Sequence, residues 1–266
     1  MTRHLAESVL KQVPGWQGGT LEELERGLTN RTWLVEKDGS RAVLKIDEEV
    51  RDAPHGSRVE EAAVQALAAA TGLAGDVLYA DDVTLMTAYV EGTVWESVAL
   101  EQDDNIERVA IALRRLHALP LSGRVFNAAV AARRYAERIE KRHETLLNRC
   151  LQVVESLPQS KDLCCCHNDL VAANMIATPD IVFLDWEYAC DNDPLFDLAT
   201  VIEHHQLSDE VAERLLDAYF EGNAEAWRDR LAGQQLLYRA LYWLWLAARP
   251  DANSDELEKA GSRVLL

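Results

Sequence analysis

The sequence predicts an α+β protein with two lobes, a small N-terminal lobe built on an antiparallel sheet and a larger, mainly helical C-terminal lobe. The first third is rich in short apolar strands separated by turn residues, and the remainder has helical periodicity. Glu91-Gly92 interrupts the chain between the two parts. We therefore place the N-terminal lobe at residues 1–89 and the C-terminal lobe at residues 90–266, long enough for each to have a core.

The N-terminal lobe is predicted to hold a five-stranded sheet and two helices. MTRHLAESVLKQV indicates an amphipathic helix ending at Pro14-Gly15, rather than a signal peptide. Asp38-Gly39 is a strong signal for a two-residue hairpin loop. Three strands are predicted within residues 20–49, with a tight turn at residues 27–30 between the first two. Two more strands are predicted at residues 76–80 and 83–90. The second helix covers residues 55–72, with Ser57 as N-cap and Gly72 as its end.

The C-terminal lobe is predicted to be helical around a few short strands. Apolar residues recur at helical spacing from Ile106 until Pro120 ends the pattern. Further helices are expected at residues 128–157, 193–205, 208–222 and 224–249, and strands at residues 163–167, 174–178 and 181–186.

The charge and the cysteines limit the partners and the compartment. A net charge of −18 makes nucleic acids and anionic membranes poor partners, whereas a small cation is a suitable one. The apolar run LYWLWLAA is too short to span a bilayer. Five cysteines, three of them adjacent, do not form a disulfide framework, so we expect a reducing cytoplasm.

The adjacent cysteines raise the question of a metal site. On a strand, Cys164 and Cys166 face one way and Cys165 faces the other, so three thiolates cannot converge on one tetrahedral ion. We therefore expect the three cysteines to be buried as small apolar residues. A role as metal ligands is the alternative.

The residues after the cysteines carry the most informative chemical pattern. His167, Asp169 and Asn174 have the spacing H-x-D-x4-N, and Asp185 follows sixteen residues beyond Asp169. Each motif alone could be a turn, since Asn and Asp favour turns. Together they suit phosphoryl transfer, in which one carboxylate accepts the proton of a hydroxyl while an amide oxygen and a second carboxylate hold Mg²⁺ against phosphates.

Lys45, late in the third predicted strand, fits the same chemistry. In a kinase-like fold, a lysine at this place lies over the α- and β-phosphates of ATP, whereas an isolated strand lysine is more often a solvated edge residue. A helix carboxylate should pair with it. Glu60 or Glu61 could do so, and we prefer Glu60.

With these residues assembled, the chain resembles the aminoglycoside phosphotransferase and choline kinase family, whose members have a protein-kinase-like fold. The resemblance covers residues 19–249 and is strongest in CHNDLVAANMI and FLDWEYACDNDPLFDLA. Asn168 and the sequence Asp185-Trp186-Glu187-Tyr188-Ala189 are most similar to the choline/ethanolamine kinase and thiamine kinase branches.

The resemblance implies a role for individual residues. Asp169 matches the catalytic base, and Asn174 and Asp185 match the Mg²⁺ ligands. His167 and Asp197 match structural residues around the catalytic loop. The positions that match ATP-binding residues are Lys45 with its partner Glu60, the loop residues Thr29, Asn30 and Arg31, and the hinge residues Met86, Thr87, Ala88 and Tyr89.

The acceptor is expected to be a small cationic alcohol. Tyr242 and Trp245 share one face of the predicted helix, with Tyr238 one turn earlier, and aromatic faces bind ammonium groups. An aromatic core stripe is the alternative. The resemblance adds Glu187 as a residue that reaches the substrate cation or a second metal ion.

The sequence therefore predicts a cytoplasmic kinase that uses ATP and Mg²⁺ to phosphorylate choline or ethanolamine. Thiamine kinase and an aminoglycoside-type antibiotic phosphotransferase are the enzyme alternatives, and a kinase-fold nucleotide-binding module is the non-enzyme alternative. The Asp-Phe-Gly and Ala-Pro-Glu signatures of protein kinases are missing. The oligomeric state stays open, with a homodimer as the common arrangement.

Overall fold

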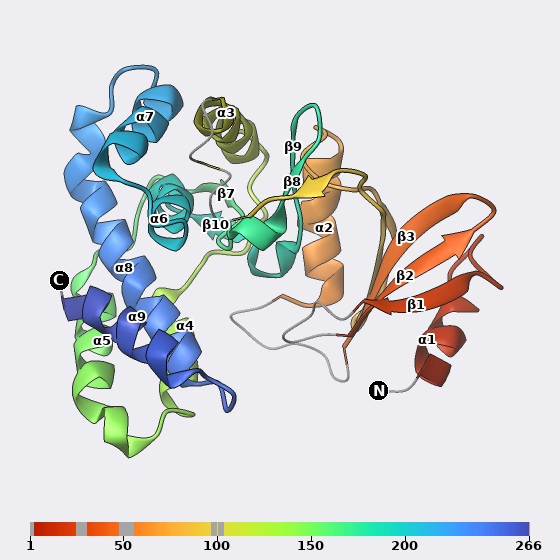
Figure 1. Cartoon of the computed structure of the whole chain (residues 1–266), viewed down its shortest axis with the longest axis horizontal. Coiled ribbons are helices and arrows are strands. Elements are labelled where there is room, and N and C mark those ends of the chain that lie inside the picture. Colours follow the sequence, from red (N-terminus) through yellow and green to blue (C-terminus); the bar gives the residue numbers. More distant parts are fainter. Residues whose placement is uncertain (1–2, 25–30, 48–55, 97–99, 101–103, 266) are drawn as a thin grey trace. The chain divides into compact units, whose positions relative to one another are not determined.

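The computed structural model describes residues 3–24, 31–47, 56–96, 100 and 104–265. The chain forms two compact units (Figure 1). The sheet unit comprises residues 1–95 and 173–189, and the helical unit comprises residues 96–172 and 190–266. The proposed lobe boundary between residues 89 and 90 stays a prediction.

The sheet unit contains a five-stranded antiparallel sheet in the order β1-β2-β3-β5-β4. The hairpin predicted at Asp38-Gly39 is present, since Lys37 pairs with Ser40 and both loop residues have positive φ, 50° and 79°. The strands are β1 (Thr20–Leu24), β2 (Arg31–Lys37), β3 (Ser40–Ile46), β4 (Val77–Ala80) and β5 (Thr84–Ala88).

Two helices complete this part of the sheet unit, α1 (Arg3–Leu10) and α2 (Arg58–Ala69). Because side chains alternate along a strand, β2 and β3 send every second residue into a core beneath α1. That core contains Ala6, Leu10, Val13, Leu21, Trp33, Val35, Ala42, Leu44, Ile46 and Met86. Helix α2 contacts β4 and β5.

The remainder of the sheet unit is a second, three-stranded sheet in the order β6-β8-β9. Its strands are β6 (Thr93–Val94), β8 (Met175–Ala177) and β9 (Ile181–Phe183). The short helix η3 (Ala172–Asn174) precedes β8, and η4 (Trp186–Tyr188) follows β9 and contacts α2. Phe183 N donates to Leu73 O at 2.8 Å, which ties β9 to the segment after α2.

The helical unit has its core around α8, which contacts α4, α5, α6 and α9. A two-stranded antiparallel sheet, β7 paired with β10, lies in the same unit. Its elements are α3 (Asn105–His117), α4 (Ala128–Ala136), η2 (Lys141–His143), α5 (Glu144–Ser156), β7 (Cys164–Cys166), β10 (Cys190–Asn192), α6 (Pro194–His204), α7 (Asp209–Phe220), η5 (Glu225–Trp227), α8 (Arg228–Ala247) and α9 (Ser254–Leu265). These elements confirm the predicted α+β class.

The prediction of one long helix over residues 128–157 is wrong. The segment forms α4 and α5, separated by a turn and η2, and both helices contact α8 and each other. A single helix of this length would extend about 45 Å, whereas the 20-residue α8 extends about 30 Å. The break allows both halves to bury apolar side chains against the same helix.

Among the described strands and α-helices, β6, β10 and α9 were not predicted. Strands β6 and β10 are too short to give a periodic pattern, and they form only because β8 and β7 offer partners. Helix α9 does carry a signal, since Leu257, Ala260 and Val264 recur at helical spacing and are at least partly buried. None of the helices in the described part of the chain combines the length and apolar character needed to cross a membrane.

Candidate active site

Lys45 is the centre of the polar network in the sheet unit. Its neighbours Leu44 and Ile46 point into the core beneath α1, so its own side chain lies on the opposite face of the sheet. The ammonium group is 2.8 Å from Asp185 Oδ1 and 3.5 Å from Glu61 Oε1. Burial alone would lower the pKa of Lys45, but the two carboxylates raise it above its ordinary value. The lysine is therefore a charged group held between two anions.

The preference for Glu60 as the partner of Lys45 is corrected. The Glu60 carboxylate accepts a hydrogen bond from Ser57 N at 2.8 Å, and Ser57 Oγ accepts one from Glu60 N, which together form a capping box at the start of α2. Glu61 is one residue further on, about 100° around the helix, and its buried side chain faces Lys45.

Arg58 holds Glu61 in place and was not found from the sequence. The arginine is fully buried and donates to both carboxylate oxygens of Asp47, at 2.8 and 2.9 Å, and to Glu61 Oε2 at 2.6 Å. Burial lowers the pKa of Arg58, and the charges of Glu61 and Asp47 more than compensate for this. No motif marks Arg58, because its role depends on helix α2 meeting the segment that carries Asp47.

Asp185 and Asn174 are brought together by their backbones. Leu184 N donates to Asn174 O at 2.8 Å, so the residue before Asp185 is bonded directly to Asn174. Asp185 adopts a left-handed conformation, with φ 62° and ψ 69°, between β9 and η4. Its side chain is 37% exposed, whereas Asn174 is largely buried. A carboxylate and an amide oxygen are hard ligands of the kind that suits Mg²⁺, so the donor set fits that ion.

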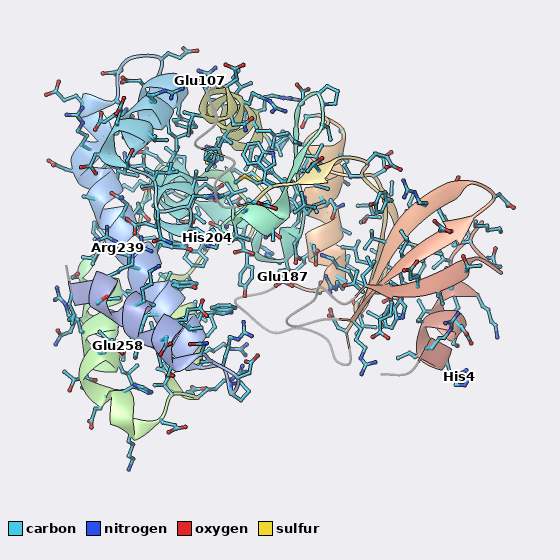
Figure 2. The ribbon with its side chains drawn as sticks, in the orientation of Figure 1. His4, Glu107, Glu187, His204, Arg239 and Glu258 are labelled. Atoms are coloured by element: carbon cyan, nitrogen blue, oxygen red, sulfur yellow. The ribbon has the colours of Figure 1, made fainter. Side chains whose placement is uncertain are left out.

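Glu187, in η4, is a buried carboxylate of the same unit (Figure 2). Its charge contributes to the raised pKa of Arg58, and its backbone carbonyl accepts from Gly56 N at 3.4 Å. Its predicted reach to a substrate cation or a second metal stays a prediction.

The structure describes only some of the residues that were predicted to contact the nucleotide. Thr29 and Asn30 lie outside the described residues, and Arg31 begins β2 as an exposed side chain 3.4 Å from Glu23. In the hinge, Met86 and Thr87 are paired within the sheet. The backbone N–H groups of Ala88 and Tyr89 donate to Asp76 O and Arg41 O. Those two donors are therefore committed to protein acceptors, and the hinge prediction remains to be tested.

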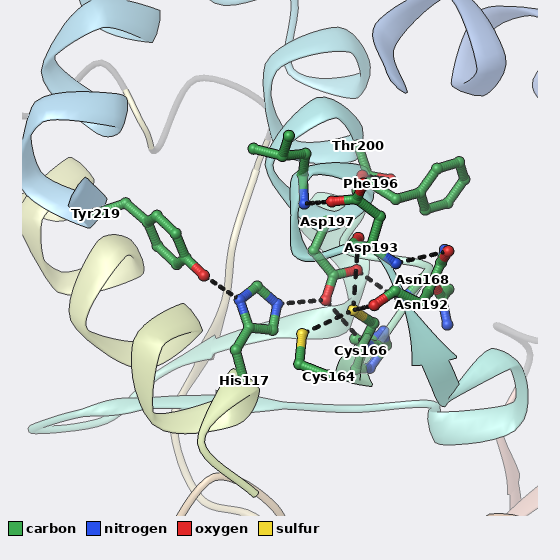
Figure 3. Close-up of polar contacts among 12 residues, drawn as sticks. His117, Cys164, Cys166, Asn168, Asn192, Asp193, Phe196, Asp197, Thr200 and Tyr219 are labelled. Carbon is green, nitrogen blue, oxygen red and sulfur yellow. Dashed lines mark hydrogen bonds and ion pairs between the residues drawn. The ribbon is translucent and has the colours of Figure 1, made fainter. Parts of the chain in front are cut away.

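Asp169 belongs to the helical unit, at the end of a tightly held turn. Asp197, fully buried at the start of α6, accepts from His167 N at 2.9 Å and from Asn168 N at 2.7 Å (Figure 3). Asn168 has a positive φ of 64°, and its side-chain oxygen accepts from Asn192 at 2.7 Å. The backbone before Asp169 is thus fixed from two sides, and Asp197 takes the bracing position that the resemblance implies.

The aromatic residues of α8 form a row that ends near Asp169. The ring of Tyr242 stacks with those of Tyr238 and Trp245, with both centroid distances 5.9 Å. Burial raises the pKa of Tyr238, and the charge of Asp169 raises it further, so the carboxylate and this ring are close. Arg249 lies 4.8 Å from the centre of the Trp245 ring. The row packs against the core cluster and is only partly buried.

We expect Glu61→Gln to reduce kcat/KM for ATP about tenfold, equal to about 1.4 kcal/mol, because Lys45 would lose one of its two anionic partners. Glu60→Gln is the matched control, since glutamine also serves in a capping box and the change should be less than about twofold. Equal losses in steady-state assays of both variants would contradict the assignment of Glu61.

The chain belongs to the phosphotransferase enzyme family, whose family model matches residues 20–232. Among curated relatives, protein LicA of Haemophilus influenzae is 29% identical over 248 residues, which cover 86% of this chain and 73% of that protein. The family resemblance and the expectation of a phosphotransferase are thereby confirmed.

Solved structures show the same fold over nearly the whole chain. The choline kinase LicA from Streptococcus pneumoniae superimposes with a TM-score of 0.81 at 20% identity, covering 98% of each chain. A structure of LicA in complex with AMP gives a TM-score of 0.78 at 19% identity and covers 98% of this chain and 96% of that one. The predicted protein-kinase-like fold is confirmed, and the protein is a phosphotransferase.

Proposed function

We propose that this protein is an ATP-dependent kinase that phosphorylates the hydroxyl group of choline or ethanolamine. The observation that carries the proposal is the Lys45 ammonium group, held 2.8 Å from Asp185 Oδ1 and 3.5 Å from Glu61 Oε1. A charged lysine beside a partly exposed carboxylate offers phosphate a cation and offers a metal ion a ligand at the same place.

The residues would divide the reaction between them. Asn174 and Asp185 would hold Mg²⁺, which when bound would neutralise charge on the β- and γ-phosphates, and Lys45 would bind the remaining phosphate oxygens. Asp169 would accept the proton of the acceptor hydroxyl. The hydroxyl oxygen then forms a bond to the γ-phosphorus, the bond from that phosphorus to the bridging oxygen breaks, and ADP leaves.

Choline is favoured as the acceptor by the aromatic row. Tyr238, Tyr242 and Trp245 are stacked and partly buried, and Tyr238 lies close to Asp169. The guanidinium group of Arg249 already rests on Trp245, so at least one face of the row attracts a cation. The relationship to LicA, a choline kinase in Streptococcus pneumoniae, supports the same acceptor.

The nucleotide and the assembly are parts of the same proposal. ATP is the expected phosphoryl donor, and the related LicA structure with AMP supports an adenine nucleotide. A cytoplasmic location and a homodimer remain predictions from the sequence.

The test is ADP production from ATP and Mg²⁺ by the purified chain, with choline, ethanolamine, thiamine and kanamycin as separate acceptors. We expect turnover with choline or ethanolamine and none above background with kanamycin. Preference for thiamine would move the protein to the thiamine kinase alternative, and preference for kanamycin would move it to the antibiotic-modifying one. ATP binding without turnover on any acceptor would overturn the proposal in favour of a nucleotide-binding module.

A further inference from the structure

Three metal-ligating side chains of the helical unit converge beside α6. They are Cys164 and Cys166 on one face of β7, and His117 at the end of α3 (Figure 3). One ligand atom from each residue lies within 4.8 Å of the other two. Cys165 points to the opposite face of the strand, as the alternation of side chains requires.

We propose that these three residues, the Cys–His cluster, bind a zinc ion. Thiolate and imidazole ligands select soft or borderline ions such as Zn²⁺ over the hard Mg²⁺ ion expected at Asn174 and Asp185. Three protein ligands leave a fourth position for water or another small ligand.

The spacing of the sulfur atoms fits such an ion. Cys164 Sγ and Cys166 Sγ are 3.5 Å apart, and two thiolates on a tetrahedral zinc ion at 2.3 Å bonds are about 3.8 Å apart. Since no two ligand atoms are more than 4.8 Å apart, binding would need them to close by at most about 1 Å, which a side-chain rotation can supply. Each thiol that binds the ion releases its proton to solvent.

The histidine has the surroundings of a metal ligand. His117 Nε2 is 3.1 Å from Asp197 Oδ2, and Nδ1 is 2.6 Å from the hydroxyl of Tyr219. To bind the ion, one ring nitrogen of His117 would give up its hydrogen bond, either to Asp197 or to Tyr219. The other ring nitrogen would keep its hydrogen bond. A second partner of this kind fixes the orientation of metal-bound histidines in general.

The consequence of binding would be structural. The ion would connect α3 to β7 next to Asp197, which accepts from the backbone of His167 and Asn168 just before Asp169. Zinc would therefore stabilise the helical unit and the turn that carries Asp169. This inference stands independently of the acceptor that the enzyme uses.

Cobalt titration of the full chain, purified without metal and kept reduced, tests the proposal. Co²⁺ bound to thiolates gives an intense near-ultraviolet charge-transfer band, which carboxylate sites do not produce. We expect this band to reach a plateau at one ion per chain and to disappear when Zn²⁺ is added. Zn²⁺ alone should raise Tm by several degrees.

Two single variants make the result specific. Cys164→Ser should abolish the band and the rise in Tm, whereas Cys165→Ser, on the same strand but the opposite face, should retain both. Far-ultraviolet circular dichroism checks that each variant is folded. The proposal is overturned if the wild-type chain gives no charge-transfer band, if Cys164→Ser keeps it, or if Cys165→Ser loses it equally.

Discussion

Replacing Asp169 by asparagine is expected to lower kcat by about 10²–10⁴-fold, the usual contribution of a positioned general base. The amide cannot accept the proton of the acceptor hydroxyl, while it keeps the size of the side chain and one acceptor oxygen. The backbone before this position is held by Asp197 through His167 N and Asn168 N, so the turn should keep its conformation. KM for ATP should change little, because the proposed phosphate contacts come from other residues.

Asp162→Asn is the matched control for this experiment. Asp162 precedes Asp169 by only a few residues, and its side chain is exposed and paired with Arg230 at the surface. Its variant should keep nearly full activity, since exposed ion pairs contribute little. If Asp169→Asn retained activity comparable with this control, Asp169 would not be the base, and the proposed mechanism would fail.

Replacing Arg58 by methionine is expected to cost about 3–5 kcal/mol of the free energy of unfolding. This is the typical loss when one member of a buried ion network is removed and the remaining charges are left without compensation. Arg58 is fully buried, and Asp47 and Glu61 are nearly so. The folded fraction of the variant should also bind ATP more weakly, because Glu61 would lose the group that holds it beside Lys45.

Urea unfolding followed by circular dichroism measures the loss. Arg3→Met is the control within the same unit, because Arg3 is 69% exposed and pairs with Glu7 one turn away on α1. It should change the stability by only about 0.3–0.5 kcal/mol. Arg58→Lys separates charge from geometry, since lysine keeps the charge but cannot make the two parallel bonds to Asp47. A loss for Arg58→Met no larger than that for Arg3→Met would refute this account of the network.

Local patterns were sufficient for much of the fold. The Asp38-Gly39 turn, the alternation along β2 and β3 and the Ser57 cap each depend on residues close in sequence, and all three are present. The long helix over residues 128–157 failed because its break depends on α8, which is far away in the sequence. The spacing of apolar residues predicts which side chains are buried. It does not predict the length of the partner helix against which they pack.

The candidate site likewise combines features that local sequence patterns predict with features that depend on the tertiary structure. The spacing of Asp169, Asn174 and Asp185 indicated phosphoryl transfer, because these residue types match the base and the Mg²⁺ ligands of that reaction. The partner of Lys45 was decided by tertiary structure. Neighbouring glutamates on a helix point about 100° apart, and the capping box turns Glu60 away from Lys45 while Glu61 faces it.

The sequence was sufficient to predict the α+β class, the Asp38-Gly39 hairpin and the residue types that carry the chemistry. Only the folded chain shows which distant side chains meet, as in the contact of Arg58 with Asp47 and that of His117 with Cys164 and Cys166. The physical reason is that backbone preferences and side-chain alternation act between near neighbours. Burial and charge pairing act between segments that come together only when the chain folds.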